Sequence, residues 1–208
     1  MLKTTHFVRY NSTIHKHVIT QDRFKETMRK MATQVMLLSI ANPIGSPKSE
    51  FRGLVASSVT SLCVLPKPKL EFNLQLPSFT SIALHKYQYF AVHIMSPTKA
   101  SVDMGRLFSK GAITSKMDGS IQPSQPFMDL EENVTFENYS IENSNLQIPV
   151  LKMAEKTLIC KKSDVFKTGD HEIWVGEVED IIVNEEEEAQ GGLLYYDRFF
   201  HMLGNKIQ

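Results

Sequence analysis

The chain has 208 residues, of which 42% are hydrophobic and 22% are charged. This composition is typical of one globular domain with its own core and excludes a wholly disordered chain. Lysine plus arginine equals aspartate plus glutamate at 23 each, so net charge gives no reason to expect a nucleic-acid partner. No apolar run approaches the roughly 18 residues of a membrane-spanning helix, and no membrane span is expected.

The two cysteines predict neither a disulfide nor a metal site. Cys63 and Cys160 lie far apart, without CxxC spacing, and each has apolar neighbours, so we expect two buried thiols. The nucleotide-binding motifs GxGxxG and GxxxxGK[ST] and the catalytic motifs HExxH and GxSxG are also absent from the sequence. We therefore expect no metal ligands.

Residues 1–21 differ in composition from the rest. They contain Lys3, Arg9 and Lys16, several hydroxyl residues and no acidic residue before Asp22. This pattern predicts a mitochondrial transit peptide, followed by one folded domain over residues 22–208. The alternative is a merely basic, poorly ordered terminus on a cytoplasmic protein.

The first expected element is a short helix capped by Thr20 or Asp22. Its residues Phe24, Met28 and Met31 have the spacing i, i+4, i+7, which predicts an apolar stripe facing a core. Strands are expected over residues 33–40, 53–62, 69–76, 89–95, 148–153, 156–161 and 171–183. The last of these loses its alternation near Gly176, which indicates a bulge.

Two further helical segments interrupt the strands. Ser78 can cap a helical turn that runs through Leu84, and Pro97 suits the first position of a helix that ends before Gly111. The polar stretch 112–144 predicts an excursion or lid with little core of its own. Many strands, few helices and no βαβ alternation predict a mainly β (α+β) fold, a closed antiparallel barrel with peripheral helices.

Three polar clusters are candidates for chemistry. Residues 53–61 are rich in small and hydroxyl side chains, which suit either a ligand site or an ordinary barrel strand. The hydroxyls of residues 78–81 at a helix start suit a phosphate, although Ser78 can equally serve as a simple cap. His171 begins a strand after a Gly-Asp turn, at the rim of a barrel, where a lone histidine is often structural.

The order and spacing of these clusters resemble the flavin-reductase-like family of FMN-binding split barrels. The resemblance covers residues 22–203 and rests on four segments: Gly53 to Ser61 followed by Pro66 and Pro68, Phe72-Asn73-Leu74 leading to Ser78–Ser81, Phe90 to Ser96, and Gly169 to Val178.

The resemblance implies an antiparallel Greek-key split β-barrel with peripheral helices that binds FMN. Val55, Ala56, Ser57 and Ser58 would then lie along the isoalloxazine ring and ribityl chain, Asn73 at the ring edge, and Ser78, Thr80 and Ser81 near the phosphate. His171 would be the catalytic residue, over the flavin where a nicotinamide stacks.

The implied function is an NAD(P)H-dependent flavin reductase that transfers hydride to flavin. Family members commonly act as homodimers and often supply reduced flavin to a partner oxygenase. Two departures keep other readings open: Leu54-Val55 replaces a frequent His/Gly-x-Thr, and the excursion 112–144 is long. The alternatives are a non-catalytic flavin-binding module docked on a larger mitochondrial assembly, and a relative that binds or oxidises a different small molecule.

Overall fold

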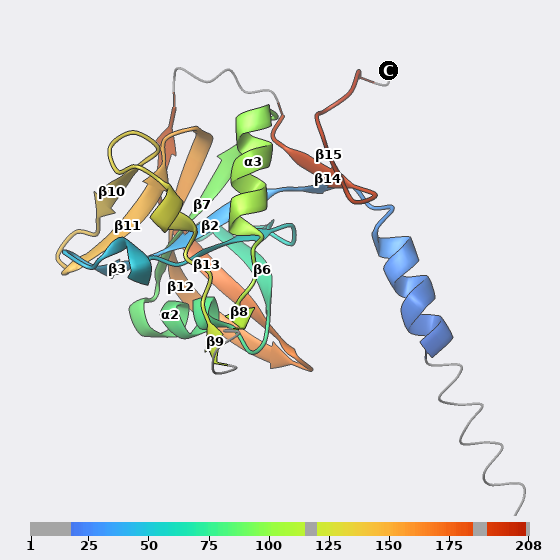
Figure 1. The fold of residues 1–208 in the computed structure, drawn as a ribbon, viewed down its shortest axis with the longest axis horizontal. Coiled ribbons are helices and arrows are strands. Elements are labelled where there is room, and N and C mark those ends of the chain that lie inside the picture. Colours follow the sequence, from blue (N-terminus) through green and yellow to red (C-terminus); the bar gives the residue numbers. More distant parts are fainter. Residues whose placement is uncertain (1–17, 115–119, 185–190, 207–208) are drawn as a thin grey trace, which may run out of the picture.

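A curled antiparallel sheet forms the body of the molecule (Figure 1). The computed structural model describes residues 18–114, 120–184 and 191–206. Seven strands follow one another across the sheet in the order β4–β2–β7–β12–β13–β6–β5. Their bounds are β2 Met36–Ile40, β4 Gly53–Ala56, β5 Thr60–Cys63, β6 Lys69–Gln75, β7 Tyr89–Met95, β12 Ala154–Thr168 and β13 His171–Val183.

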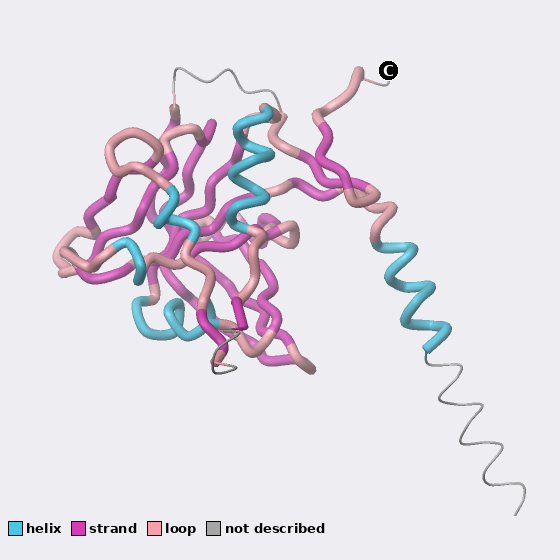
Figure 2. Tube along the Cα trace, in the orientation of Figure 1, coloured by secondary structure: helices cyan, strands magenta, loops and turns pink. Residues whose placement is uncertain are grey.

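Smaller sheets and helices surround this body. The small sheets are β1 (Thr33–Gln34) with β14 (Leu194–Tyr196) and β15 (Phe199–His201), β10 (Phe136–Ser140) with β11 (Leu146–Leu151) and β3 (Asn42–Pro43), and β8 (Ile113–Thr114) with β9 (Ile121–Gln122). Helices α2 (Phe79–Tyr87) and α3 (Lys99–Phe108), a helix over residues 18–28 and two 3-10 turns, Lys48–Glu50 and Pro126–Asp129, lie at the periphery (Figure 2). The predicted antiparallel, mainly β split barrel with peripheral helices is confirmed.

The segment expected as one strand over residues 53–62 is two strands. β4 pairs with β2 and β5 pairs with β6, so consecutive strands lie at opposite edges of the sheet. Residues 57–59 are the corner that joins these edges, and the hydroxyl oxygen of Ser58 accepts a hydrogen bond from the Asn73 amide of β6 at 2.9 Å. Small side chains suit this corner because the two edges approach each other there.

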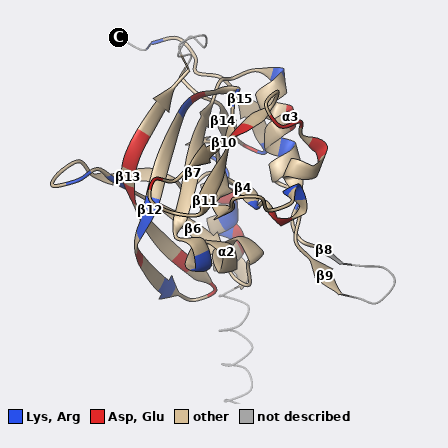
Figure 3. Ribbon diagram, turned by 90° about the vertical axis from the view of Figure 1, so that its left-hand side faces the viewer, with Lys and Arg blue, Asp and Glu red and all other residues tan. Residues whose placement is uncertain are grey.

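The expected strands over residues 89–95 and 171–183 match β7 and β13. The pairing of β12 with β13 is irregular near Gly176, but the residue without a cross-strand partner there is Ser163 of β12. A second irregularity in the same strand pair leaves Glu179 of β13 without a cross-strand partner. Gly176 has another role, because a Cβ atom at this position would collide with the Phe90 ring. Positive and negative side chains are interspersed along β12 and β13 (Figure 3).

The excursion contributes to the core, contrary to prediction. Phe127 and Phe136 are fully buried. Phe127 packs edge-on against Phe51 and Phe108, with ring centroids 5.7 and 5.2 Å apart. Aromatic side chains within a polar stretch therefore anchor the second half of the excursion.

The N-terminal helix differs from its prediction in two respects. It already includes residues 18–20, so neither Thr20 nor Asp22 caps it, and the expected boundary between residues 21 and 22 lies inside it. Its apolar stripe faces no core in the single chain, since Phe24, Met28 and Met31 are 63%, 43% and 54% exposed. The helix instead projects from the barrel (Figure 1).

Helix α3 begins two residues later than Pro97 suggested. Thr98 caps it, and its hydroxyl oxygen accepts a hydrogen bond from the Ser101 amide at 3.2 Å. Within the described ranges, no helix is long and apolar enough to cross a membrane.

Both cysteines are free thiols. Burial raises the pKa of Cys160 well above its ordinary value, and the charge of Glu179 adds to this effect. Cys63 is only half-buried, which is less than predicted.

Candidate functional site

A cavity of about 750 Å³ opens where β4, the start of α2 and the end of α3 meet. Its walls come from four places in the sequence: residues 52–55, residues 75–82, residues 108–112 and the first part of the excursion. The residues that line it are Arg52, Gly53, Leu54, Val55, Gln75, Pro77, Ser78, Phe79, Thr80, Ile82, Phe108, Ser109, Lys110, Gly111, Ala112, Ile121, Pro123 and Ser124.

The first turn of α2 forms one end of this cavity. Ser78 is the N-cap as predicted, and its hydroxyl oxygen accepts a hydrogen bond from the Ser81 amide at 3.2 Å. Thr80 lies in the same turn and also lines the cavity. The first amides of a helix have no carbonyl partner within the helix, so this turn suits an anionic group.

The charges around the cavity favour an anion as well. Arg52 and Lys110 line it, and none of its described lining residues is a carboxylate. One Arg52 nitrogen, Nη1, donates to the carbonyl oxygens of Ser49 and Phe51 at 2.7 and 3.0 Å, which fixes the guanidinium in place. Burial lowers the pKa of Arg52, and the charge of Glu50 opposes this effect. Arginine remains a cation at neutral pH.

The remaining wall is apolar. Leu54, Val55 and Phe108 stand on one side, and Phe79 and Ile121 add further apolar surface. The cavity therefore has a largely apolar lining that also includes hydroxyl groups and two cationic side chains. This combination fits a ligand that carries both a flat ring system and a phosphate.

Three of the predicted site residues, Val55, Ser78 and Thr80, are brought together at this cavity. Ala56 is buried in the barrel core, at 5% exposure. Ser57 opens instead into a neighbouring cavity of about 560 Å³ that shares Val55 and Ser109 with the first.

Ser58 and Asn73 lie at the barrel corner, where the Asn73 amide donates to the Ser58 hydroxyl oxygen. Neither residue lines the 750 Å³ cavity. The Asn73 side chain is exposed. Their assignment to the ribityl chain and the ring edge stays a prediction.

Ser81 points to the other side of α2. Its hydroxyl donates a hydrogen bond of 2.6 Å to Oε2 of Glu172, which also accepts one of 3.1 Å from Trp174 Nε1. Oε1 of the same carboxylate lies 3.1 Å from Nε2 of His85. The Ser81 hydroxyl therefore joins α2 to β13.

His171 begins β13 as predicted but does not line the cavity. Its Nδ1 lies 2.8 Å from Oδ1 of Asp170, and Gln75 Nε2 donates to the other Asp170 oxygen at 3.3 Å. The hydrogen bond with His171 is the main cause that lowers the pKa of Asp170. His171 is paired with Gln75 across β13 and β6, and Gln75 lines the cavity, so His171 lies next to the lining without being part of it.

Sequence reasoning missed Arg52, Gln75 and Lys110 as lining residues. Gln75 and Lys110 had structural interpretations, Gln75 on the polar side of an alternating strand and Lys110 as a favourable charge in the last turn of a helix. Arg52 stands directly before the small-residue cluster. Its charge beside that cluster was the signal that could have identified it.

The sequence profile of the family described as "Flavin reductase like domain" matches residues 28–204. This chain belongs to that family. The match includes all four segments on which the resemblance was based, among them residues 53–61 and the start of β13.

Solved structures share the fold at low sequence identity. A flavin reductase domain protein from Arthrobacter sp. FB24 is 21% identical, with a TM-score of 0.67 over 90% of this chain and 98% of that one. The NADH:FAD oxidoreductase SgcE6 of Streptomyces globisporus is 20% identical, with a TM-score of 0.66 over 90% of each chain. A homologue of nitrilotriacetate monooxygenase component B from Mycobacterium thermoresistibile is 17% identical, with a TM-score of 0.68 over 92% of this chain and 93% of that one.

Proposed function

We propose that this protein binds FMN in the 750 Å³ cavity and acts as an NAD(P)H-dependent flavin reductase. The observation that carries the proposal is the composition of that cavity. Apolar side chains, the hydroxyl residues Ser78 and Thr80 at a helix start, and an arginine whose guanidinium is held by backbone carbonyl oxygens all line this one cavity. No carboxylate is among its described lining residues.

Each part of the ligand has a matching part of the cavity. Ser78, Thr80 and Arg52 hold the phosphate, because charge-assisted hydrogen bonds from hydroxyls, amides and guanidinium are strong. Leu54 and Val55 lie against the ring. Ser57 and Ser58 hold the ribityl chain from the adjoining corner, which requires the ligand to extend past Val55 and Ser109, the two residues shared with the neighbouring cavity that Ser57 lines. Bound flavin supplies the two-electron chemistry by accepting a hydride, while the protein binds and orients the reactants.

The electron donor in this proposal is NADH or NADPH, whose nicotinamide gives up the hydride and is oxidised to NAD(P)⁺. His171 positions the donor at the edge of the flavin, with Asp170 holding its imidazole ring. The name of the Streptomyces structure, an NADH:FAD oxidoreductase, supports a nicotinamide donor and makes FAD the alternative flavin.

A second candidate is a non-catalytic flavin-binding module docked on a larger assembly. The absence of His171 from the described cavity lining favours it, because the expected catalytic side chain contacts Asp170 instead. This candidate binds flavin by the same residues but does not accept hydride from a nicotinamide.

Titration and anaerobic reduction separate these functions. FMN and FAD are titrated separately into the full chain, and the flavin absorbance is then followed after NADH or NADPH is added without oxygen. Binding followed by bleaching supports the reductase. Binding without bleaching supports the module, and failure of both flavins to bind overturns the proposal.

Further parts of the proposal concern assembly and location. We propose a homodimer, which the exposed apolar side chains around β14 and β15 support. We also propose a partner oxygenase that receives reduced flavin, which the name of the Mycobacterium structure supports.

We further propose that residues 1–21 direct the protein to mitochondria, because this segment is basic and contains no acidic residue. The N-terminal sequence of protein recovered from mitochondria tests the location.

A further inference from the structure

The N-terminal helix carries an apolar stripe that nothing in the single chain covers. We call residues 18–31 the arm. Phe24 and Met28 are one helical turn apart, and Met31 follows in the bend just after the helix. These three side chains are 63%, 43% and 54% exposed. Arg29 is half-buried, and every other residue from 18 to 32 is exposed. Three large apolar side chains exposed so close together indicate an interface rather than a solvated surface.

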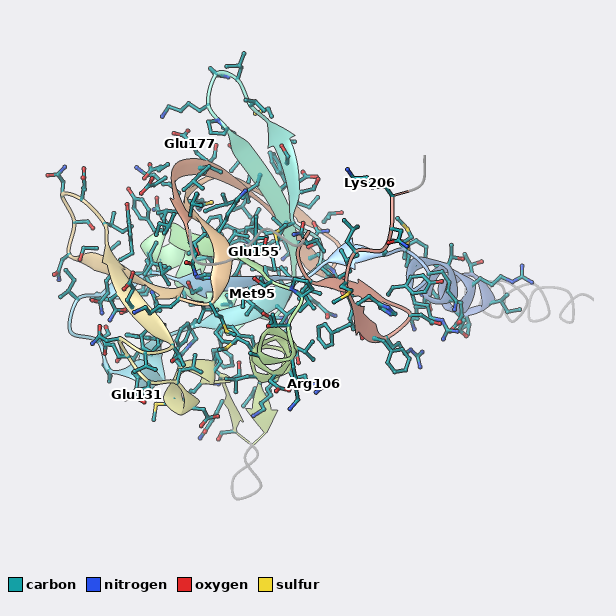
Figure 4. The ribbon with its side chains drawn as sticks, turned by 90° about the horizontal axis from the view of Figure 1, so that it is seen from above. Met95, Arg106, Glu131, Glu155, Glu177 and Lys206 are labelled. Carbon is teal, nitrogen blue, oxygen red and sulfur yellow. The ribbon has the colours of Figure 1, made fainter. Side chains whose placement is uncertain are left out.

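The base of the arm is fixed, so the arm keeps its direction. Asp197, in the turn between β14 and β15, binds Arg29 Nε at 3.2 Å and Lys30 Nζ at 2.5 Å. Its backbone amide also donates to the Arg29 carbonyl oxygen at 2.9 Å. These contacts hold the arm pointing away from its own barrel, as Figures 1 and 4 show from two directions.

A groove of suitable character lies close to this base. The 560 Å³ cavity is lined by Val35, Val102 and Phe200, with Phe199 69% exposed and Tyr195 38% exposed at its rim. Arg106 also lines it and stands on the side of α3 that faces the β14–β15 hairpin (Figure 4). We call this cavity the groove.

We propose that two copies of the chain exchange arms, so that the stripe of each arm lies in the groove of the other copy. The same surface carries both the arm and the groove, so one two-fold axis near the β14–β15 hairpin satisfies both contacts at once. The inference rests on the homodimer proposed above and does not require that the protein binds flavin.

Residues 1–17, which we call the leader, are a poorer occupant of the groove. The groove contains Arg106 and Arg198, and the leader is also basic, since it carries Lys3, Arg9 and Lys16 and no acidic residue occurs before Asp22. Like charges would meet if the leader lay there. The arm instead offers an uncharged stripe, with its charged side chains on the opposite side of the helix.

Arm exchange would also place the partner next to the flavin cavity. The groove and the flavin cavity share Val55 and Ser109. A partner's arm seated in the groove would therefore pack against the far side of the wall that borders the flavin ring. Dimer formation and flavin affinity should then be linked.

Sedimentation of the full chain tests the exchange. Wild type should have twice the 23.7 kDa of one chain. The double variant Phe24→Ser/Met28→Ser should dissociate at a concentration at least tenfold higher than wild type does. The matched control Ile44→Ser/Val134→Ser removes apolar side chains that are 51% and 61% exposed. These residues adjoin β3 and β10, which lie on the side of the barrel away from the arm (Figure 1), so the control should leave the dimer unchanged.

A disulfide experiment identifies the receiving surface. In a Cys63→Ser background, the Met28→Cys/Val102→Cys variant should oxidise to a covalent dimer on a non-reducing gel. A bond within one chain, or none, overturns the exchange, as does an unchanged dimer in Phe24→Ser/Met28→Ser. Loss of the dimer on removal of residues 1–17 would make the leader the occupant. A monomeric wild type would instead overturn the homodimer itself.

Discussion

The carboxylate of Glu172 on β13 accepts a hydrogen bond of 2.6 Å from the hydroxyl of Ser81 on α2. The same carboxylate binds Trp174 Nε1 and contacts His85, so one side chain holds the helix against the barrel end. Burial acts to raise the pKa of Glu172, but the hydrogen bonds from Ser81, His85 and Trp174 outweigh it and lower the pKa. Ser81, which sequence analysis assigned to the phosphate, supports the turn that carries Ser78 and Thr80.

Replacing Glu172 by Gln should destabilise the protein and weaken FMN binding together. A hydrogen bond to a charged group contributes about 1.5–3 kcal/mol, so the free energy of unfolding should fall by roughly that amount. FMN affinity should fall several-fold as the first turn of α2 loosens. Urea unfolding and FMN titration measure the two effects, and Glu177→Gln on the same strand is the control because Glu177 pairs only with exposed Lys67. Unchanged FMN affinity in Glu172→Gln would separate this carboxylate from the flavin site.

Replacing Thr80 by Ala should weaken FMN binding by roughly tenfold to a hundredfold, because a charge-assisted hydrogen bond to the phosphate is lost. The fold should persist, since removing one hydroxyl costs only about 1 kcal/mol. Fluorescence titration measures the affinity, and Thr60→Ala on exposed β5 is the matched control. Equal FMN affinity in Thr80→Ala and wild type would show that the phosphate lies elsewhere.

Replacing Ser58 by Ala should also weaken FMN binding by roughly tenfold. This change removes the acceptor for the Asn73 amide, so the stability of the variant must be measured alongside its FMN affinity.

Replacing His171 by Ala should slow reduction of bound flavin by NADH or NADPH while FMN affinity stays nearly unchanged. The reason is that His171 contacts Asp170 and lies outside the cavity lining. Stopped-flow absorbance under anaerobic conditions gives the rate. His201→Ala, an exposed histidine on β15, is the control. A rate equal to wild type would remove His171 from the reaction.

His93 should make the fold sensitive to acid. It is fully buried in β7, its Nδ1 lies 2.9 Å from the Leu37 carbonyl oxygen, and its Nε2 has no hydrogen-bond partner among the described residues. Burial lowers the pKa of His93 from 6.5 to about 4, against a smaller opposing effect of the Leu37 hydrogen bond. Only the unfolded chain binds a proton readily between these values, so stability is complete above about pH 6.5 and falls as the pH drops towards 4.

The loss attributable to His93 is roughly 3 kcal/mol between pH 7 and pH 4. Urea unfolding at both pH values should show it as a difference between wild type and His93→Phe, which lacks the titrating group. His201→Gln serves as control, since His201 is exposed. If the control and His93→Phe show the same pH dependence, the acid sensitivity has another source. Should His93→Phe fail to fold, His93→Gln replaces it.

Removing residues 1–17 should leave the melting temperature within about 1 °C of wild type. The first buried side chain in the described part of the chain is Val35, and the arm that precedes it contributes no core contact. Differential scanning fluorimetry at equal protein concentration measures the effect. A much lower melting temperature would mean that the leader is part of the folded domain.

Local patterns were sufficient for much of the fold. The alternation of residues 69–76 predicted β6, and the segments 89–95 and 171–183 have the bounds of β7 and β13 because each strand is bordered by a turn or a cap. The spacing of the polar clusters, together with the family resemblance, led to Val55, Ser78 and Thr80, which do meet at one cavity.

The errors concern features that depend on contacts between distant parts of the chain, and the expected closed barrel is itself one of them, because the seven-stranded sheet is curled but keeps two edges, β4 and β5. Residues 53–62 have one continuous strand-like composition, yet the chain crosses there from one edge of the sheet to the other. The hydrogen bond from the Asn73 amide of β6 to the Ser58 hydroxyl oxygen stabilises this crossing, and the local sequence does not reveal it. Phe127 and Phe136 lie in a polar stretch, and only the presence of Phe51 and Phe108 beside them explains their burial. Ser81 could not be distinguished from Ser78 and Thr80 until Glu172 was located.

Phe108 belongs to two environments at once. Its ring packs against Phe127 in the aromatic core, and the residue also forms part of the flavin cavity wall. A ligand in the flavin cavity would therefore add contacts to a wall that the aromatic core already supports. Binding should raise the melting temperature in proportion to the logarithm of ligand concentration above the dissociation constant. Heating the protein with a panel of flavins, with no electron donor present, would then rank FMN against FAD by fit alone.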